Sequence, residues 1–340
     1  MSTTTKLKDN TALTLFSPRV AKFSATLSLT AAAVFFNACS KEPEAVELAE
    51  AQLAEKAPTV VVDAYPAGEE PGLDAMGVGE SKGSRLDQIL AAQSQETQAR
   101  YPYRNPKETI AFLGLKPGMT VVEVLPGGGW YSGILASYLG SSGRLVGLDY
   151  PSTIWTAMGR DQAYIDKRMA RNQEWITKHK GMTDAAAVEF YAFDKAPKEL
   201  NGQVDSVVFI RALHNMARLE EKGGFLSDSL AAVSAMLKPG GTVGIVQHAV
   251  AENAPDSLAD GSKGYLKASA IKRAMSEAGF QFVAESDVNL NPSDQPAEGD
   301  SVWRLLPSLA IDKDDPEKQK AYRAIGESNR VTLLFRKPMS

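Results

Sequence analysis

The sequence predicts an α/β fold, with a mostly parallel sheet of seven strands and helices on both faces. Three observations predict it. Short runs rich in β-branched residues alternate with longer stretches of helical periodicity. The strand-like runs are continuously apolar, as in parallel strands buried on both faces. The first of them passes through a glycine cluster directly into an apolar helix, which is typical of a strand–turn–helix unit.

The expected elements follow from these patterns. Order begins near Ser84 with a helix, and a second helix is expected over 106–113, where Pro106 suits the first turn. Strands are expected at 119–125, 143–149, 187–193, 205–210, 242–247, 280–285 and 330–336. Helices are expected between them at 130–139, 153–180, 224–236 and 265–278. The sequence Leu-Lys-Pro-Gly occurs before the first and fifth strands and predicts a repeated helix-to-strand turn.

The first 38 residues predict a secretory signal, because four basic side chains precede an uncharged apolar run over 23–38. The run ends at Cys39, the only cysteine. It resembles a bacterial lipoprotein signal, which implies that Cys39 is lipidated and anchors the protein in the cell envelope, facing the periplasm. Ser40 after the cysteine resembles outer-membrane sorting. The alternatives are an uncleaved anchor or a misassigned start codon, and an unused signal would leave the protein in the cytoplasm.

Residues 39–83 are rich in Ala, Glu, Pro and Gly and have weak apolar periodicity, which predicts a flexible tether. Residues 84–338 are then expected to form a single domain.

Composition narrows the function classes. The net charge is −4 and no basic stripe with interleaved aromatics occurs, so nucleic-acid binding is not indicated. A single cysteine excludes an internal disulfide and a cysteine-rich zinc site. There are three histidines, at positions 179, 214 and 248, and a two-histidine metal site has no spacing signature here. We therefore expect a small-molecule substrate and no metal.

The order of features around the first strand indicates a nucleoside cofactor. The strand ends at Gly127, Gly128 and Gly129, which open a helix, and the second strand ends in Asp149 about 20 residues later. Glycines let a backbone approach a ligand closely, and a carboxylate at that position accepts ribose hydroxyls. The arrangement fits either a nicotinamide dinucleotide or an adenosyl cofactor.

The run Glu123-Val124-Leu125-Pro126-Gly127-Gly128-Gly129 resembles the first motif of class I S-adenosylmethionine-dependent methyltransferases. Leu125 stands where that motif has its first glycine. Leu-Lys-Pro-Gly-Gly before the fifth strand and a last strand at the C-terminus are also similar to that family. The Pro-Gly-Gly-Gly-Trp-Tyr core looks like a group of predicted, often exported, bacterial methyltransferases. The resemblance covers about residues 84–338 and implies a Rossmann-like methyltransferase sheet with S-adenosylmethionine as cofactor.

The resemblance also implies roles for individual residues. Glu123 would contact the cofactor's ammonium group. The backbone of Leu125 and of the glycines would run alongside the cofactor's methionine portion and ribose. Asp149 would hold the ribose hydroxyls, and Asp194 would accept from the adenine N6. On structural grounds alone, Asp149 is also suited to cap the next helix and Asp194 to a solvated, charged loop. A buried, unpartnered Glu123 is hard to explain structurally.

Candidate catalytic residues follow the fourth and fifth strands, whose carboxyl ends share one rim in the expected strand order. They are Arg211, His214 and Asn215 after one strand and His248 after the other. Either histidine is a candidate general base, and Arg211 and Asn215 are candidates for orienting an anionic or amide substrate. The alternative is a histidine that caps a helix or packs in a turn; the third histidine is expected at the surface.

Four further residues are candidates for substrate contact. Tyr101, Tyr103 and Arg104 precede the sheet, where this fold often places a lid, and Tyr131 begins the helix beside the expected cofactor. Packing of these aromatic residues on the core is the alternative.

The predicted function is S-adenosylmethionine-dependent methyl transfer to a small acceptor. Two alternatives remain open: a non-catalytic envelope binding module on the same fold, and a NAD-type oxidoreductase. Because S-adenosylmethionine is made in the cytosol and the signal predicts export, the binding-module alternative has to be weighed. Apart from the lipid anchor no membrane contact is expected, and the sequence does not indicate an oligomeric state.

Overall fold

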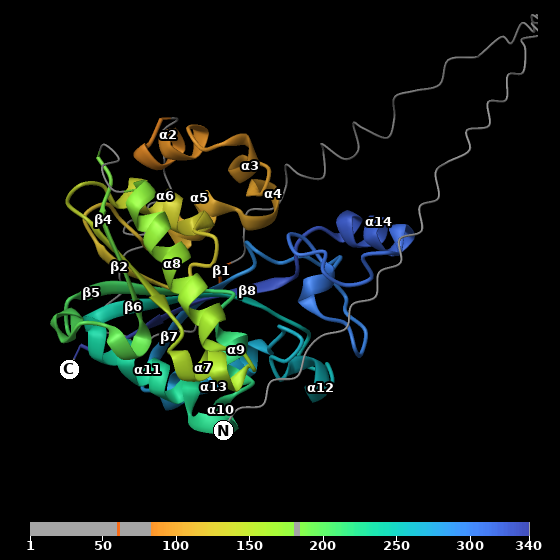
Figure 1. Cartoon of the computed structure of the whole chain (residues 1–340). Coiled ribbons are helices and arrows are strands. Elements are labelled where there is room, and N and C mark those ends of the chain that lie inside the picture. The colour runs from red at the N-terminus through yellow and green to blue at the C-terminus, as the bar shows by residue number, and fades with distance from the viewer. Residues whose placement is uncertain (1–59, 62–82, 180–183, 340) are drawn as a thin grey trace, which may run out of the picture. The chain divides into compact units, whose positions relative to one another are not determined.

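The computed structural model describes residues 60–61, 83–179 and 184–339, which form one eight-stranded sheet with helices around it (Figure 1). The strands are β1 (Val60–Val61), β2 (Thr120–Val124), β3 (Arg144–Asp149), β4 (Ala187–Ala192), β5 (Val204–Ile210), β6 (Leu237–His248), β7 (Gln281–Ser286) and β8 (Arg330–Arg336). All seven predicted strands are present. The predicted signal peptide, Cys39 and the 39–83 tether, except Val60–Val61 and Gly83, lie outside the described residues.

The sheet order is β1-β7-β8-β6-β5-β2-β3-β4. Strands β4, β3, β2, β5 and β6 are parallel, whereas β8 runs antiparallel between β6 and β7. The predicted mostly parallel α/β sheet is therefore confirmed. From β2 the chain continues to β3 on one side, and it later returns to β5 on the other side. This topological switch point is where open α/β sheets bind their ligands.

The main helices are α2 (Arg85–Ala91), α5 (Pro106–Phe112), α6 (Trp130–Leu139), α7 (Ser152–Ala157), α8 (Gln162–His179), α11 (Phe225–Met236), α13 (Ala268–Glu277) and α14 (Pro316–Ile325). Short helices α3 (Gln95–Gln98), α4 (Tyr101–Arg104), α9 (Leu213–Ala217), α10 (Glu220–Gly223) and α12 (Asp256–Ala259) were not expected. The single helix predicted over 153–180 is wrong, because Gly159 adopts φ 75° and separates α7 from α8.

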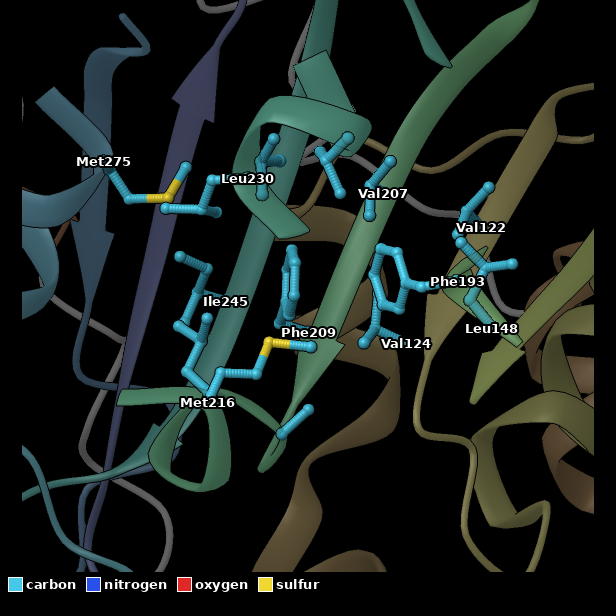
Figure 2. Packing of buried hydrophobic residues seen from close by; sticks show 14 of the residues in the cluster. Val122, Val124, Leu148, Phe193, Val207, Phe209, Met216, Leu230, Ile245 and Met275 are labelled. Atoms are coloured by element: carbon cyan, nitrogen blue, oxygen red, sulfur yellow. The ribbon is translucent and has the colours of Figure 1, made fainter. Parts of the chain in front are cut away.

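The two faces of the sheet carry separate apolar cores. In β2, Val122 and Val124 belong to the cluster beneath α7, α11 and α13, whereas Val121 faces the cluster under α2, α5 and α6. Figure 2 shows part of the first cluster, where strand residues Phe209 and Ile245 lie near Met216. Side chains alternate between faces along a strand, so Glu123 lies on the same face as Val121, toward α6.

The two Leu-Lys-Pro-Gly segments differ. The first forms the predicted turn, in which Gly118 adopts φ 82° and donates to the carbonyl of Leu139 at 2.8 Å. The second lies inside β6, where the pairing register with β5 shifts between Val204 and Ser206. None of the helices in the described ranges has the length and apolar character needed to cross a bilayer.

Candidate functional site

A hollow opens where β2 and β5 end, at the switch point. Both strands are followed by a non-glycine residue in the left-handed region, Leu125 with φ 53° and Arg211 with φ 59°. Their amides donate to the carbonyls of Leu148 and Val246, each at 2.7 Å. Left-handed conformations cost free energy for residues with a side chain and concentrate at functional sites. The two strained residues turn the neighbouring chains away from the sheet and leave space between them.

The hollow encloses about 430 Å³. Its walls come from the glycine loop and start of α6, the segments after β5 and β6, two arginines before the sheet, and the loop over 302–308. The lining residues are Arg100, Arg104, Glu123, Leu125, Pro126, Gly127, Gly128, Trp130, Tyr131, Ile210, Arg211, His214, Asn215, His248, Val302, Trp303, Leu306, Pro307 and Ser308. The structure thus brings most of the predicted site residues together.

Glu123 forms part of the buried wall of this hollow. Its side chain is on the α6 face of β2, is 3% exposed, and accepts a hydrogen bond from the Ser132 hydroxyl at 2.5 Å. Burial raises its pKa to about 7, although the bond from Ser132 and the charge of Arg211 oppose this rise. Glu123 is therefore poised to ionise near neutral pH, when a cation enters the hollow.

Four arginines surround one buried carboxylate beside the hollow. Glu327 is 2% exposed; Arg104 donates to it from Nε at 2.9 Å, Arg330 lies 3.2 Å away, and Arg100 also pairs with it. Arg211 is more distant, with its Nη1 3.8 Å from Glu327 Oε2. Burial alone would raise the pKa of Glu327, but the guanidiniums hold it below its ordinary value. The group therefore keeps several positive charges in excess.

The hydrogen bonds of Gln247 determine the tautomer of His214. Gln247 Nε2 donates to the carbonyl of Gly264 at 3.0 Å and lies 3.3 Å from His214 Nδ1. Because an amide nitrogen only donates, Nδ1 must accept and the ring proton lies on Nε2. Burial lowers the pKa of His214 to about 3, and the charge of Arg218 adds to this. His214 is thus a neutral hydrogen-bond donor and is unsuited to accept a proton.

His248 is the remaining candidate base. Its ring lies 5.7 Å from that of His214, and its Nδ1 is hydrogen-bonded to the Ser328 hydroxyl. Burial holds the pKa of His248 well below its ordinary value, and the nearby charges of Arg211, Arg330 and Arg104 act in the same direction. The imidazole is neutral at physiological pH and available as a weak base.

The nucleoside half of the predicted site is closed by α8. Asp149 is 0% exposed, and its carboxylate accepts from the backbone N–H of Tyr150 at 2.7 Å, from Arg168 Nε at 2.5 Å and from Asn172 Nδ2 at 3.1 Å. Arg168 also stacks over the Trp155 ring, with 4.3 Å between the guanidinium carbon and the ring centroid. Asp149 therefore does not line the hollow; it joins α8 to the end of β3.

A second residue of α8 lies against the glycine loop. A Cβ atom on Gly129 would stand 2.2 Å from the indole Nε1 of Trp175, whereas one on Gly128 would meet no atom within 4 Å. The residues present thus fit the methionine portion of an adenosyl cofactor, beside Glu123 and Gly128. They do not fit its nucleoside in this conformation, because the side chains of Arg168, Asn172 and Trp175 occupy the space beside Asp149 and Gly129.

Other predicted residues lie outside the hollow. Asp194 is 43% exposed and pairs with Lys195 at 3.5 Å, as in a solvated loop. Tyr101 donates to the carbonyl of Leu90 at 2.8 Å, and Tyr103 packs against Gly326. Their packing matches the structural alternative rather than substrate contact.

Two of the predicted substrate-contact residues do line the hollow. Arg104 lies over the Trp130 ring at 4.5 Å, and Tyr131 is buried and donates to the carbonyl of Arg104 at 3.0 Å. The side chain of His179, predicted at the surface, lies outside the description.

No sequence pattern pointed to Arg100, Glu327, Arg330 or the wall formed by Trp303 and its neighbours. Arg100 and Glu327 are 227 positions apart, and their pairing has no local pattern. The isolated acidic residue before the last strand was the available signal. No group of three or more metal-ligating side chains suited to a metal ion occurs within the described ranges.

Comparisons with known proteins find similarity in structure but not in sequence. No protein-family model and no curated protein sequence matches the chain. A methyltransferase from Aquifex aeolicus described as SAM-dependent is similar over 58% of this chain and 89% of its own, with 18% identity and a TM-score of 0.39. Geranyl diphosphate C-methyltransferase from Streptomyces coelicolor A3(2) is similar over 78% of this chain and 87% of its own, with 16% identity and a TM-score of 0.43. The likeness is one of fold alone.

Proposed function

We propose that the protein transfers a methyl group from S-adenosylmethionine to a small acceptor. The observation that carries the proposal is Glu123, a buried carboxyl in the wall of a hollow at the sheet's switch point, beside the open backbone of Gly128. A carboxyl whose pKa lies near 7 becomes a carboxylate when an ammonium approaches. The cofactor's amino group would supply that ammonium.

Such a reaction needs little acid–base catalysis from the protein. When bound, the cofactor supplies a methyl group on a positively charged sulfur, and alignment accounts for most of the rate. His214 would donate a hydrogen bond from Nε2, and His248 would take a proton where the acceptor has to lose one. The walls of Trp130, Trp303 and Leu306 would exclude water from this space.

A second candidate is a binding module that keeps the fold without turnover. The closure of the nucleoside half favours it, because Asp149 is already paired with Arg168 and Trp175 lies against Gly129. The two candidates differ in one respect. Methyl transfer requires α8 to release Asp149, whereas a binding module leaves α8 in place.

Calorimetric titration with S-adenosylmethionine, S-adenosylhomocysteine and NAD separates these functions. Micromolar binding of the first two ligands, with no binding of NAD, supports methyl transfer. Glu123→Ala and Asp149→Ala should each weaken the binding of these two ligands at least tenfold. The control is Glu285→Gln, which removes a carboxylate of β7 that pairs with Lys272 of α13. This variant should bind both ligands as the wild type does. Binding of none of the three ligands would refute methyl transfer and leave the binding module; binding of NAD alone would indicate an oxidoreductase.

We also propose that residues 1–38 are removed as a signal and that lipidated Cys39 anchors the domain in the cell envelope. The support is the sequence pattern alone. Metabolic labelling with a radioactive fatty acid should mark the wild-type chain and the control Ser40→Ala, but not Cys39→Ser. An unlabelled wild-type chain in the cytosolic fraction would contradict this proposal.

A further inference from the structure

The charges around the hollow do not balance. The hollow is lined by Arg100, Arg104 and Arg211, and Arg330 lies beside them. Two carboxyl groups are near these arginines: Glu327, which pairs with them, and Glu123, which lines the hollow. Four guanidiniums thus face one ionised carboxylate and one carboxyl whose pKa is about 7. At least two positive charges lack compensation in a partly buried space, and such an excess costs free energy until an anion enters.

Arg211 is the arginine most free to bind a ligand. Its side chain is 25% exposed, and within the described part of the chain its guanidinium makes one ion pair, at 3.8 Å from Glu327, and no hydrogen bond. Its backbone is held in the left-handed conformation at the carboxyl end of β5. A guanidinium offers five donors in a plane that matches a carboxylate or phosphate. The strained backbone thus places an unsatisfied anion-binding group in the hollow.

The bound cofactor would not cancel this charge. S-adenosylmethionine carries a sulfonium, an ammonium and one carboxylate, and so adds one net positive charge to the hollow. Even if its carboxylate pairs with one arginine, the net charge of the four arginines, the two carboxyl groups and the cofactor stays positive. Trp130, Ile210 and Trp303 give the hollow an apolar wall, beside the polar side chains of His214, Asn215, His248 and Ser308. A volume of about 430 Å³ lies in the lower part of the range of ligand sites, roughly 300–1,000 Å³.

We infer that this hollow binds a small organic anion, with its carboxylate or phosphate on Arg211 and Arg100 and its apolar body against Trp130 and Trp303. That this anion is the methyl acceptor rests on the proposed function; its binding does not. Arg104 and Arg330, each 3% exposed and paired with Glu327, hold the local field positive, whereas Arg100 and Arg211 are 22% and 25% exposed and can reach a ligand. Neutral molecules of the same shape bind poorly, because they leave the arginines uncompensated.

The test titrates matched pairs of probes into the 340-residue chain, with and without saturating S-adenosylhomocysteine. The carboxylate pair is benzoate and benzamide, and the phosphate pair is phenyl phosphate and phenol. Fluorescence of the two tryptophans in the wall and calorimetry report binding. We expect at least one anion to bind at least tenfold more tightly than its neutral partner, and the preferred pair to identify carboxylate or phosphate as the head group.

Two variants localise the binding. Arg211→Gln should weaken the preferred anion at least tenfold, whereas Arg273→Gln, an exposed arginine on α13, should leave it unchanged. Equal binding of anions and neutral partners, or an unaltered Arg211→Gln, overturns the inference. Anion binding without S-adenosylhomocysteine binding would sustain this inference and refute methyl transfer. The reverse result would sustain methyl transfer and refute the anionic ligand.

Discussion

The proton on Glu123 has a calculable effect on stability. Its pKa is about 7 in the folded chain against an ordinary value of 4.5, because burial disfavours the charged form. The folded state binds this proton more tightly than the unfolded state, so the contribution of Glu123 to stability falls as pH rises from 4.5 to 7 and stays low above 7. A pKa difference of one unit corresponds to ~1.4 kcal/mol, so above pH 7 the free energy of unfolding is lower by about 3 kcal/mol than it is at low pH.

Glu123→Gln removes the ionisation and keeps an oxygen that accepts from the Ser132 hydroxyl. We expect the variant to be more stable than the wild type by less than about 1 kcal/mol near pH 5 and by about 3 kcal/mol at pH 8. Urea unfolding of both chains at pH 5, 6, 7 and 8 measures the difference, in which the other titrating groups cancel. The surface variant Glu285→Gln should not reproduce this gain.

The same substitution also tests the role of the carboxyl. Under the proposed function, Glu123→Gln should bind S-adenosylhomocysteine at least tenfold more weakly while unfolding at higher urea. A stability difference that is constant from pH 5 to 8 would falsify the reasoning about burial. A stabilised variant with unchanged affinity would sustain the burial argument and contradict the cofactor role.

Two further predictions concern α8. Breaking a buried ion pair costs about 3 kcal/mol, so Arg168→Gln should lower the melting temperature; because it releases Asp149 for ribose, it should strengthen S-adenosylhomocysteine binding by roughly 10- to 100-fold. A weaker affinity in calorimetry would show that α8 helps to form the site instead. Gly129→Ala adds a Cβ within 2.2 Å of the Trp175 indole and at φ 77°, so it should displace that ring and change tryptophan emission. Gly128→Ala, which meets no atom within 4 Å, is the control; equal spectra for the two variants would contradict the placement of α8.

The sequence by itself determined the sheet and the place of the hollow. Alternating apolar runs and helical stretches carry local periodicities, and these fixed β2 to β8 within a few residues, apart from the early start of β6. The glycine cluster after β2 and the histidines after β5 and β6 follow strand ends, and parallel strands bring their carboxyl ends to one edge. Arg211, His214 and His248 therefore lie on one rim, as predicted from the order of the strands.

Only the tertiary structure decided which charged groups are free to act. Asp149 is at the predicted position, yet α8 folds back and pairs it with Arg168. Arg104 and Glu327 are 223 positions apart and meet through the fold. A charge pair of that kind leaves no periodicity in the sequence, because it depends on how distant segments pack rather than on local backbone geometry. Whether a carboxylate serves a ligand or a helix is therefore determined by its neighbours in space.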